Sequence, residues 1–180
     1  MATDIFRFGK WALLGVAGLL AGCGDGPASS VSYKHSDQVW EFFVFAVKDG
    51  PMLVEIDGNP FAGPKEALDE VVTAAMRATF TEPFVSFTTD RAAAVQPDYR
   101  VLWTLNPAAG YDINAVCTAH PAVDPAPRDR LEMRVAFCQG GRLLAAVHGW
   151  MPAREAGPDN ARWRSLISQM SRQLVSKEGT

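Results

Sequence analysis

The chain has few of the residues, and none of the short motifs, from which common enzyme sites are built. Only 3 of its 180 residues are cysteines and 3 are histidines. Signatures of serine hydrolases, zinc peptidases and dinucleotide-binding proteins, such as G-x-S-x-G, H-E-x-x-H and G-x-G-x-x-G, are absent. No Cys-x-x-Cys pair indicates a redox couple. We therefore expect a protein that is not an enzyme and binds no cofactor.

An excess of basic residues and long apolar runs are also missing. Lys and Arg number 17 against 20 Asp and Glu, and this net charge of −3 argues against sequence-independent binding to nucleic acid. After the N-terminal segment, no apolar run reaches the roughly 20 residues of a transmembrane helix. Hydrophobic residues make up 48% of the chain, which is enough for a globular core, and the length suits one domain.

The N-terminal segment has the pattern of a signal peptide. Arg7 and Lys10 provide a short basic region, and the uncharged apolar stretch 11–20 follows. This stretch is too short to span a bilayer, but it has the length of the hydrophobic part of a secretory signal. We therefore interpret residues 1–22 as a signal peptide.

The end of this segment resembles the lipobox of bacterial lipoproteins. The motif is Leu20-Ala21-Gly22-Cys23. The resemblance implies that the chain is cleaved before Cys23, that the Cys23 thiol is diacylated and that the new amine is acylated. Several acyl chains anchor a protein stably to a membrane. Gly24 stands where an Asp would resemble a signal for retention in the inner membrane. The resemblance therefore implies a lipoprotein of the outer membrane that faces the periplasm.

Composition divides the remaining chain into a tether and one domain. Residues 24–38 are rich in Gly, Ser and charge and have no periodic pattern, which is typical of a flexible linker. We thus expect a lipidated tether over 23–38 and a single folded domain over 39–180.

Within this domain the pattern predicts mostly strands. The expected strands are 40–47, 52–56, 84–88, 99–105, 131–138 and 142–150, with a further short strand at 115–118. Two amphipathic helices are expected, one after Pro64 and one after Asn160. The last two long strands form a hairpin with a two-residue turn at 140–141. In the expected register Met133 lies opposite His148 on the apolar face, and the other face carries Glu132 and Arg134.

These elements predict an α+β fold. Strands that follow one another in sequence favour a mostly antiparallel sheet, and the two helices would cover one face to give a two-layer sandwich. This order of elements resembles small periplasmic accessory lipoproteins, such as the lipopolysaccharide-assembly lipoprotein family. The resemblance implies helices packed on an antiparallel sheet.

Cys117 and Cys138 leave two interpretations open. In an oxidising periplasm a disulfide is expected, and it would stabilise the fold by roughly 3 kcal/mol. The alternative is a zinc site of Cys117, His120, Cys138 and His148, which begins with ligand-like Cys-x-x-His spacing. We favour the disulfide and expect no metal.

The sequence favours a non-catalytic scaffold or accessory module in the envelope, and the alternative is a small-ligand or metal-binding lipoprotein. The expected partners are the membrane, through the lipid, and an envelope protein, but not nucleic acid. The irregular segment 106–129 is long enough to be functional. Its second half, 118–128, could contact the envelope partner, together with Tyr111 and His120. The sheet face of Glu132 and Arg134 is the next candidate.

Overall fold

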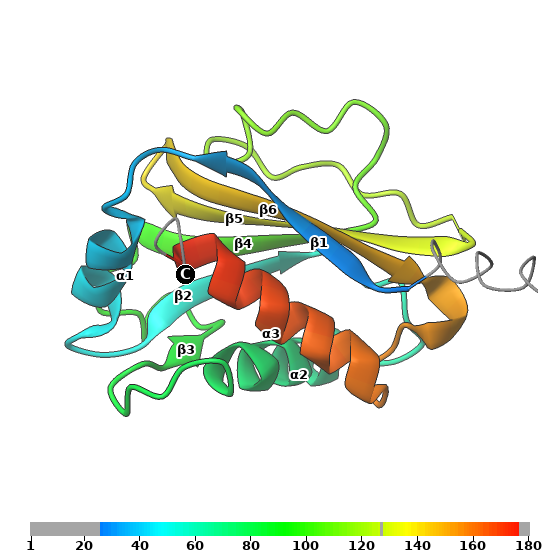
Figure 1. Cartoon of the computed structure of the whole chain (residues 1–180), viewed down its shortest axis with the longest axis horizontal. Coiled ribbons are helices and arrows are strands. Elements are labelled where there is room, and N and C mark those ends of the chain that lie inside the picture. Colours follow the sequence, from blue (N-terminus) through cyan, green and yellow to red (C-terminus); the bar gives the residue numbers. More distant parts are fainter. Residues whose placement is uncertain (1–25, 127, 177–180) are drawn as a thin grey trace, which may run out of the picture.

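In the part of the chain that the structure describes, residues 26–126 and 128–176, six strands form one mixed sheet and three helices pack against one of its faces (Figure 1). The structure is a computed structural model. Its strands are β1 (Ala28–Lys34), β2 (Met52–Asp57), β3 (Phe87–Thr88), β4 (Tyr99–Leu105), β5 (Arg130–Gln139) and β6 (Arg142–Pro152). Its helices are α1 (Val39–Val47), α2 (Lys65–Arg77), the short 3-10 helix η1 (Ala153–Glu155) and α3 (Ala161–Val175).

The expected signal peptide and Cys23 lie outside the described residues. Within those residues, none of the helices has the length and apolarity of a bilayer-spanning segment.

The strands lie in the order β1-β6-β5-β4-β2-β3. The pairs β1–β6, β6–β5 and β5–β4 are antiparallel, whereas β2 runs parallel to both β4 and β3. Parallel neighbours need a long crossover, and the segment containing α2 provides the one between β2 and β4. The predicted α+β sandwich is confirmed, although its sheet is mixed because of the parallel pairs at the β2–β3 edge.

The first helix corrects one prediction. The sequence predicts a strand over 40–47, but this run forms α1. Its buried residues recur at helical spacing and join the main core: Val39, Phe43, Ala46 and Val47. Because nearly every residue of the run is apolar, the sequence offers no contrast between two faces that would distinguish a helix from a buried strand.

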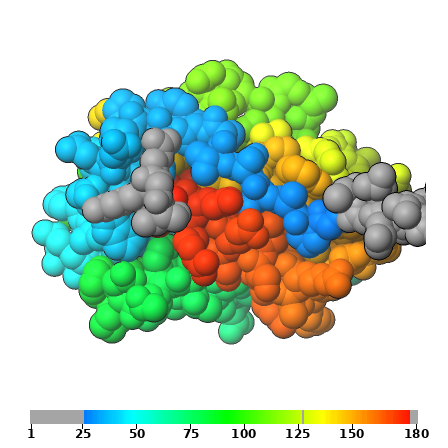
Figure 2. Space-filling view, in the orientation of Figure 1, coloured from blue at the N-terminus to red at the C-terminus, as the bar shows by residue number. Residues whose placement is uncertain are grey.

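The first strand corrects a second prediction. Residues 28–34, expected to be part of a flexible tether, form the edge strand β1, which pairs antiparallel with β6 and lies beside α3 (Figures 1 and 2). Without β1, β6 would present an open edge of unpaired backbone groups. The tether expected over 23–38 is therefore wrong for this part, and the ordered domain starts before residue 39.

The hairpin of β5 and β6 is confirmed, and Gly140, at φ 54°, begins its two-residue turn. A β-bulge lies close to the turn. Cys138 pairs with Leu143, but the preceding residue, Phe137, pairs with Ala145. The extra residue on β6 shifts every later pair by one position, and a shift of one residue exchanges the two faces of a strand.

The bulge decides which face His148 occupies. The sequence predicts Met133 opposite His148, on the face that meets the helices. In the structure Met133 lies opposite Gly149, and His148 lies opposite Arg134 on the other face. His148 therefore belongs to the polar face of the sheet and not to the core.

The main core lies between the helices and the sheet. Helices α2 and α3 lie side by side on that face, and each presents the apolar stripe that its sequence predicts (Figure 1). The close approach of α3 to β6 depends on Gly149, since a Cβ at this position would lie 2.4 Å from Met170 Sδ. At the start of α3, the Asn160 side chain accepts a hydrogen bond of 2.8 Å from the Arg162 N–H.

The opposite face of the sheet is partly covered by the segment between β4 and β5, residues 106–129, which we call the cover segment (Figure 1). A smaller apolar cluster fixes this segment to the sheet: Leu102, Val116, Cys117, Ala136 and Cys138. The short strand predicted at 115–118 is instead a series of turns, and the strand predicted at 84–88 is reduced to β3. The described residues of this segment therefore lie on the sheet as an irregular cover and add no strand to it.

Candidate functional site

A disulfide between Cys117 and Cys138 holds the cover segment against the sheet. Both cysteines are buried in the smaller cluster. This is the bond that the sequence favoured, and it removes both thiols from metal binding. The alternative site of Cys117, His120, Cys138 and His148 would need both cysteines as free thiolates, which the disulfide does not leave, and the described residues contain no group of three or more His, Cys, Asp or Glu placed to hold a metal ion.

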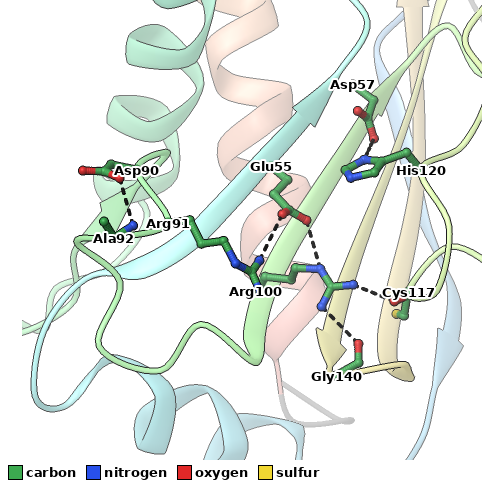
Figure 3. A network of polar contacts seen from close by, with 9 residues as sticks. All are labelled: Glu55, Asp57, Asp90, Arg91, Ala92, Arg100, Cys117, His120 and Gly140. Atoms are coloured by element: carbon green, nitrogen blue, oxygen red, sulfur yellow. Dashed lines mark hydrogen bonds and ion pairs between the residues drawn. The ribbon is translucent and has the colours of Figure 1, made fainter.

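Arg100 strengthens the same attachment (Figure 3). Its Nε lies 2.9 Å from Glu55 Oε2 on the neighbouring strand. Its terminal nitrogens donate to the carbonyl oxygens of Gly140, at 3.0 Å, and Cys117, at 2.6 Å. Arg91 also pairs with Glu55, at 3.6 Å. The Arg100 side chain thus joins β2, β4, the hairpin turn and the cover segment, and its role is structural.

His120 lies at the edge of this network. Its Nδ1 is 3.2 Å from Asp57 Oδ2 at the end of β2, and its side chain is 69% exposed (Figure 3). An exposed polar contact of this kind contributes little to stability. The structure therefore places His120 on the rim of the cover segment, where it positions no other predicted site residue.

A row of polar side chains crosses the same face of the sheet. The strand register places Asp57, Thr104, Arg134, His148 and Ser30 opposite one another on β2, β4, β5, β6 and β1. We call these five residues the polar row. Side chains opposite one another on adjacent strands point to the same face, with Cα atoms about 4.5–5.5 Å apart in antiparallel pairs. The row is therefore a continuous line of polar groups across the sheet.

Unpaired atoms concentrate at the centre of this row. Thr104 Oγ1, Arg134 Nε and His148 Nε2 are buried without a hydrogen-bond partner, and so is Oη of Tyr111, which reaches the row from the cover segment. Each such atom costs about 1–3 kcal/mol if nothing completes its hydrogen bonds. Among the described residues, the other buried side-chain atom without a hydrogen-bond partner is Trp163 Nε1, which lies in the main core. We therefore take the centre of the polar row as the candidate functional site.

The Tyr111 ring and the Arg134 guanidinium lie against each other at this site, with Cζ 5.6 Å from the ring centroid. Burial raises the pKa of Tyr111 to about 12, although the Arg134 cation and the Thr104 hydroxyl both act to lower it. The Thr104 hydroxyl lies near the phenol, but neither oxygen reaches hydrogen-bond geometry. The phenol is therefore protonated at neutral pH, and the guanidinium beside it is charged.

Groups of both charges surround His148 and act on its pKa in opposite directions. Burial lowers its pKa, the Arg134 and Arg130 cations lower it further, and Glu132 acts in the opposite direction. Glu132 pairs with Arg130 at 3.0 Å, and this hydrogen bond lowers the pKa of the carboxyl. The ring of Trp150 lies 5.4 Å from the imidazole. At neutral pH the site thus contains an uncharged imidazole beside an arginine.

Sequence reasoning found part of this site. It predicted Glu132 and Arg134 on the face away from the helices, and the structure places them there. It did not single out Thr104, although alternation along β4 puts Arg100 and Thr104 on one face. The contact of Tyr111 with Arg134 depends on the path of an irregular segment, which no sequence period describes.

Comparisons with known proteins do not identify the chain. Neither protein-family profiles nor curated proteins give a match. The solved structures that are similar to this chain include two PelC dodecamers of Paraburkholderia phytofirmans. They are 11% identical, with TM-scores of 0.46 and 0.45, and the alignments cover 83% and 84% of this chain and 98% and 99% of the PelC chains. A likeness at this level identifies neither the family nor the function of the chain.

Proposed function

We propose that the protein is a lipid-anchored accessory module of the bacterial envelope that binds a partner and catalyses no reaction. The lipobox that ends at Cys23 and the disulfide, which suits an oxidising compartment, support this proposal. In this proposal the lipid holds the protein at the outer membrane, facing the periplasm. The sheet face opposite the helices binds an envelope protein.

The observation that carries the proposal is the cluster of unpaired polar atoms around Tyr111 and the polar row. Buried polar groups in folded proteins are almost always hydrogen-bonded, so several unpaired ones at one place mark an unusual site. The terminal nitrogens of Arg134, which are not among the buried atoms, can reach a partner there. Thr104, Arg134 and His148 come from three neighbouring strands. Because a sheet fixes the spacing of such side chains, the cluster is suited to recognising a group of defined shape.

Two groups of the site, Tyr111 and Arg134, are suited to binding rather than to proton transfer. A general acid or base works best with a pKa near the working pH. The pKa of Tyr111 is raised to about 12, and an arginine side chain offers hydrogen-bond donors and no acceptor. Both groups therefore serve as permanent hydrogen-bond donors.

Site-specific photo-crosslinking in cells tests this proposal. A photoreactive amino acid replaces Ser30, an exposed member of the polar row, in the full-length protein. The matched control carries it at Glu70, which is exposed on α2 behind the sheet. We expect a discrete crosslinked product from position 30 and none from position 70, and Arg134→Gln should weaken it. Equal products from both positions, or no product from position 30, would contradict the proposed binding face.

A further inference from the structure

We propose that Arg134 and His148 bind a carboxylate group, and that the ring of Tyr111 holds the Arg134 guanidinium in position. This inference rests on the proposed function, because it names the chemical group that the partner presents to the polar row. It also covers the second possibility raised by the sequence, a small ligand, since a free organic acid carries the same group.

Arg134 lacks the partners that a half-buried arginine normally has. It forms no ion pair or hydrogen bond with any described residue, and its Nε is buried. A buried charge that lacks an opposite charge is costly. The two terminal nitrogens are not among the buried unpaired atoms, so they remain accessible. They present the fork of donors that matches the two oxygens of a carboxylate.

Arg100 shows what a structural arginine on the same face looks like. Its nitrogens bind Glu55 and the carbonyl oxygens of Gly140 and Cys117, so its charge and its donors are already satisfied within the fold. Arg134 contacts an aromatic ring and has no ion-pair partner among the described residues, and Glu132 acts on it only at longer range. The contrast indicates that the anion for Arg134 comes from outside the described fold.

His148 supplies a second contact beside the guanidinium. It lies directly opposite Arg134 in the strand register. Its Nε2 is buried, whereas Nδ1 is not among the buried unpaired atoms and forms no hydrogen bond with the described residues. An imidazole N–H at Nδ1 can therefore donate to one oxygen of a carboxylate held by Arg134.

The charge of the site selects a monoanion. Arg130, the other nearby cation, already pairs with Glu132, and this carboxylate lies close enough to act on the imidazole. Arg134 is therefore the cation of the site without an ion-pair partner among the described residues, but Glu132 acts on it at longer range, and Asp57 and Asp112 act on Tyr111 beside it. A single carboxylate meets less repulsion from these anions than a dianion does. A phosphate or sulfate dianion would bring a second negative charge toward Glu132 without a second free cation.

The groups around His148 set the direction of a pH dependence. Arg134 and Arg130 disfavour its protonated form, and Glu132 favours it. A carboxylate bound beside the imidazole adds a second favourable charge. Binding should therefore raise the pKa of His148. By linkage, the carboxylate should bind more tightly as the pH falls and His148 becomes protonated.

Nuclear magnetic resonance on the full chain in detergent micelles tests the inference. The chain is labelled in its 3 histidines, and His148→Gln assigns the His148 signal. Sodium acetate, sodium sulfate and sodium chloride are added at equal ionic strength. We expect acetate to shift the His148 signal saturably and to raise the pKa of His148. Arg134→Gln should weaken acetate binding by roughly tenfold or more. Arg91→Gln, which removes an equal charge from an exposed arginine on the rim, should not.

Two results would overturn the inference. If chloride shifts the His148 signal as much as acetate does, the shift comes from ionic screening and not from binding of a carboxylate. If sulfate binds more tightly than acetate, the site selects a different anion.

Further titrations distinguish the two sources of the carboxylate. A short blocked peptide with one Glu that binds as weakly as acetate indicates a side chain on a partner protein. An organic acid that binds far more tightly than both indicates a small ligand. Crosslinking from position 30 is a separate readout. A crosslink without acetate binding would refute the carboxylate inference and would still support the proposed binding of a partner.

Discussion

Single residues on the open sheet face divide into those that hold the fold and those that are available for binding. Arg100 and Glu55 tie the cover segment to the sheet, and their exposed fractions are small, at 15% and 23%. Arg134 and His148, by contrast, retain unused polar atoms. A substitution of Arg100 should therefore reduce stability, whereas a substitution of Arg134 should mainly reduce binding.

The pH dependence of stability reports on His148. Its pKa in the folded protein is lowered from the ordinary value of 6.5, so the unfolded chain binds the proton more tightly. The contribution to stability is complete above the unfolded pKa and is lost as the pH falls through 6.5 toward the folded pKa. We expect the urea midpoint to decrease between about pH 7.5 and pH 5.5.

Two variants separate His148 from other titrating groups. His148→Gln should flatten this decrease. Arg134→Gln should make it smaller, because the loss of the cation raises the pKa of His148 toward its ordinary value. The same slope in all three proteins would show that the imidazole does not contribute.

The disulfide is the main support of the cover segment. It joins residues 21 positions apart, and a cross-link of this span stabilises a fold by about 3 kcal/mol. We expect the double variant Cys117→Ala and Cys138→Ala to lose about this much free energy of unfolding, measured by urea denaturation of the full chain.

Ala119→Ser provides the control for the disulfide, because it changes an exposed residue of the same segment. It should alter the free energy of unfolding by less than about 0.5 kcal/mol. If the double variant were as stable as this control, the disulfide would have no role in holding the segment.

The contact between α3 and β6 depends on a missing side chain. Gly149→Ala would place a methyl group 2.4 Å from Met170 Sδ, and Met170 is completely buried. Because α3 or Met170 must move, we expect a loss of about 1–3 kcal/mol in the free energy of unfolding, measured with urea. In Gly26→Ala the new Cβ meets nothing within 4 Å, so stability should not change. Equal stability of the two variants would refute the packing argument.

Elements with contrast between two faces were predictable from the sequence. Helices α2 and α3 show an apolar stripe at helical spacing, and the β5–β6 hairpin shows alternation and a glycine turn. Helix α1 lacks such contrast, so it was mistaken for a strand. Strand β1 is polar and exposed, and only pairing with β6 makes it a strand.

The candidate site was less predictable than the fold. Alternation on β5 placed Glu132 and Arg134 correctly. The face of His148 depended on one bulged residue, which neither composition nor periodicity reveals. The contact of Tyr111 with Arg134 joins an irregular segment to a strand, and such contacts are set by tertiary packing.

For the whole molecule, the proposed lipid on Cys23 is the attachment to the membrane. We expect Cys23→Ser to leave the protein unacylated, so it should move from the membrane fraction to the soluble fraction after cell disruption and a high-salt wash. A variant that still sediments with membranes, without maturation by another signal peptidase, would contradict the lipoprotein interpretation.

The early start of β1 sets the height of the binding site above a membrane. An extended chain covers at most about 3.5 Å per residue, so Ala28 can lie no more than roughly 18 Å from Cys23. Ser30 lies about 7 Å further along β1, and Arg134, two strands across the sheet, lies about 10 Å from Ser30. With acyl chains on Cys23, Arg134 is confined to a shell roughly 35 Å deep above the lipid headgroups. A partner must therefore present its carboxylate within this shell, which favours proteins that are themselves embedded in or anchored to the same leaflet.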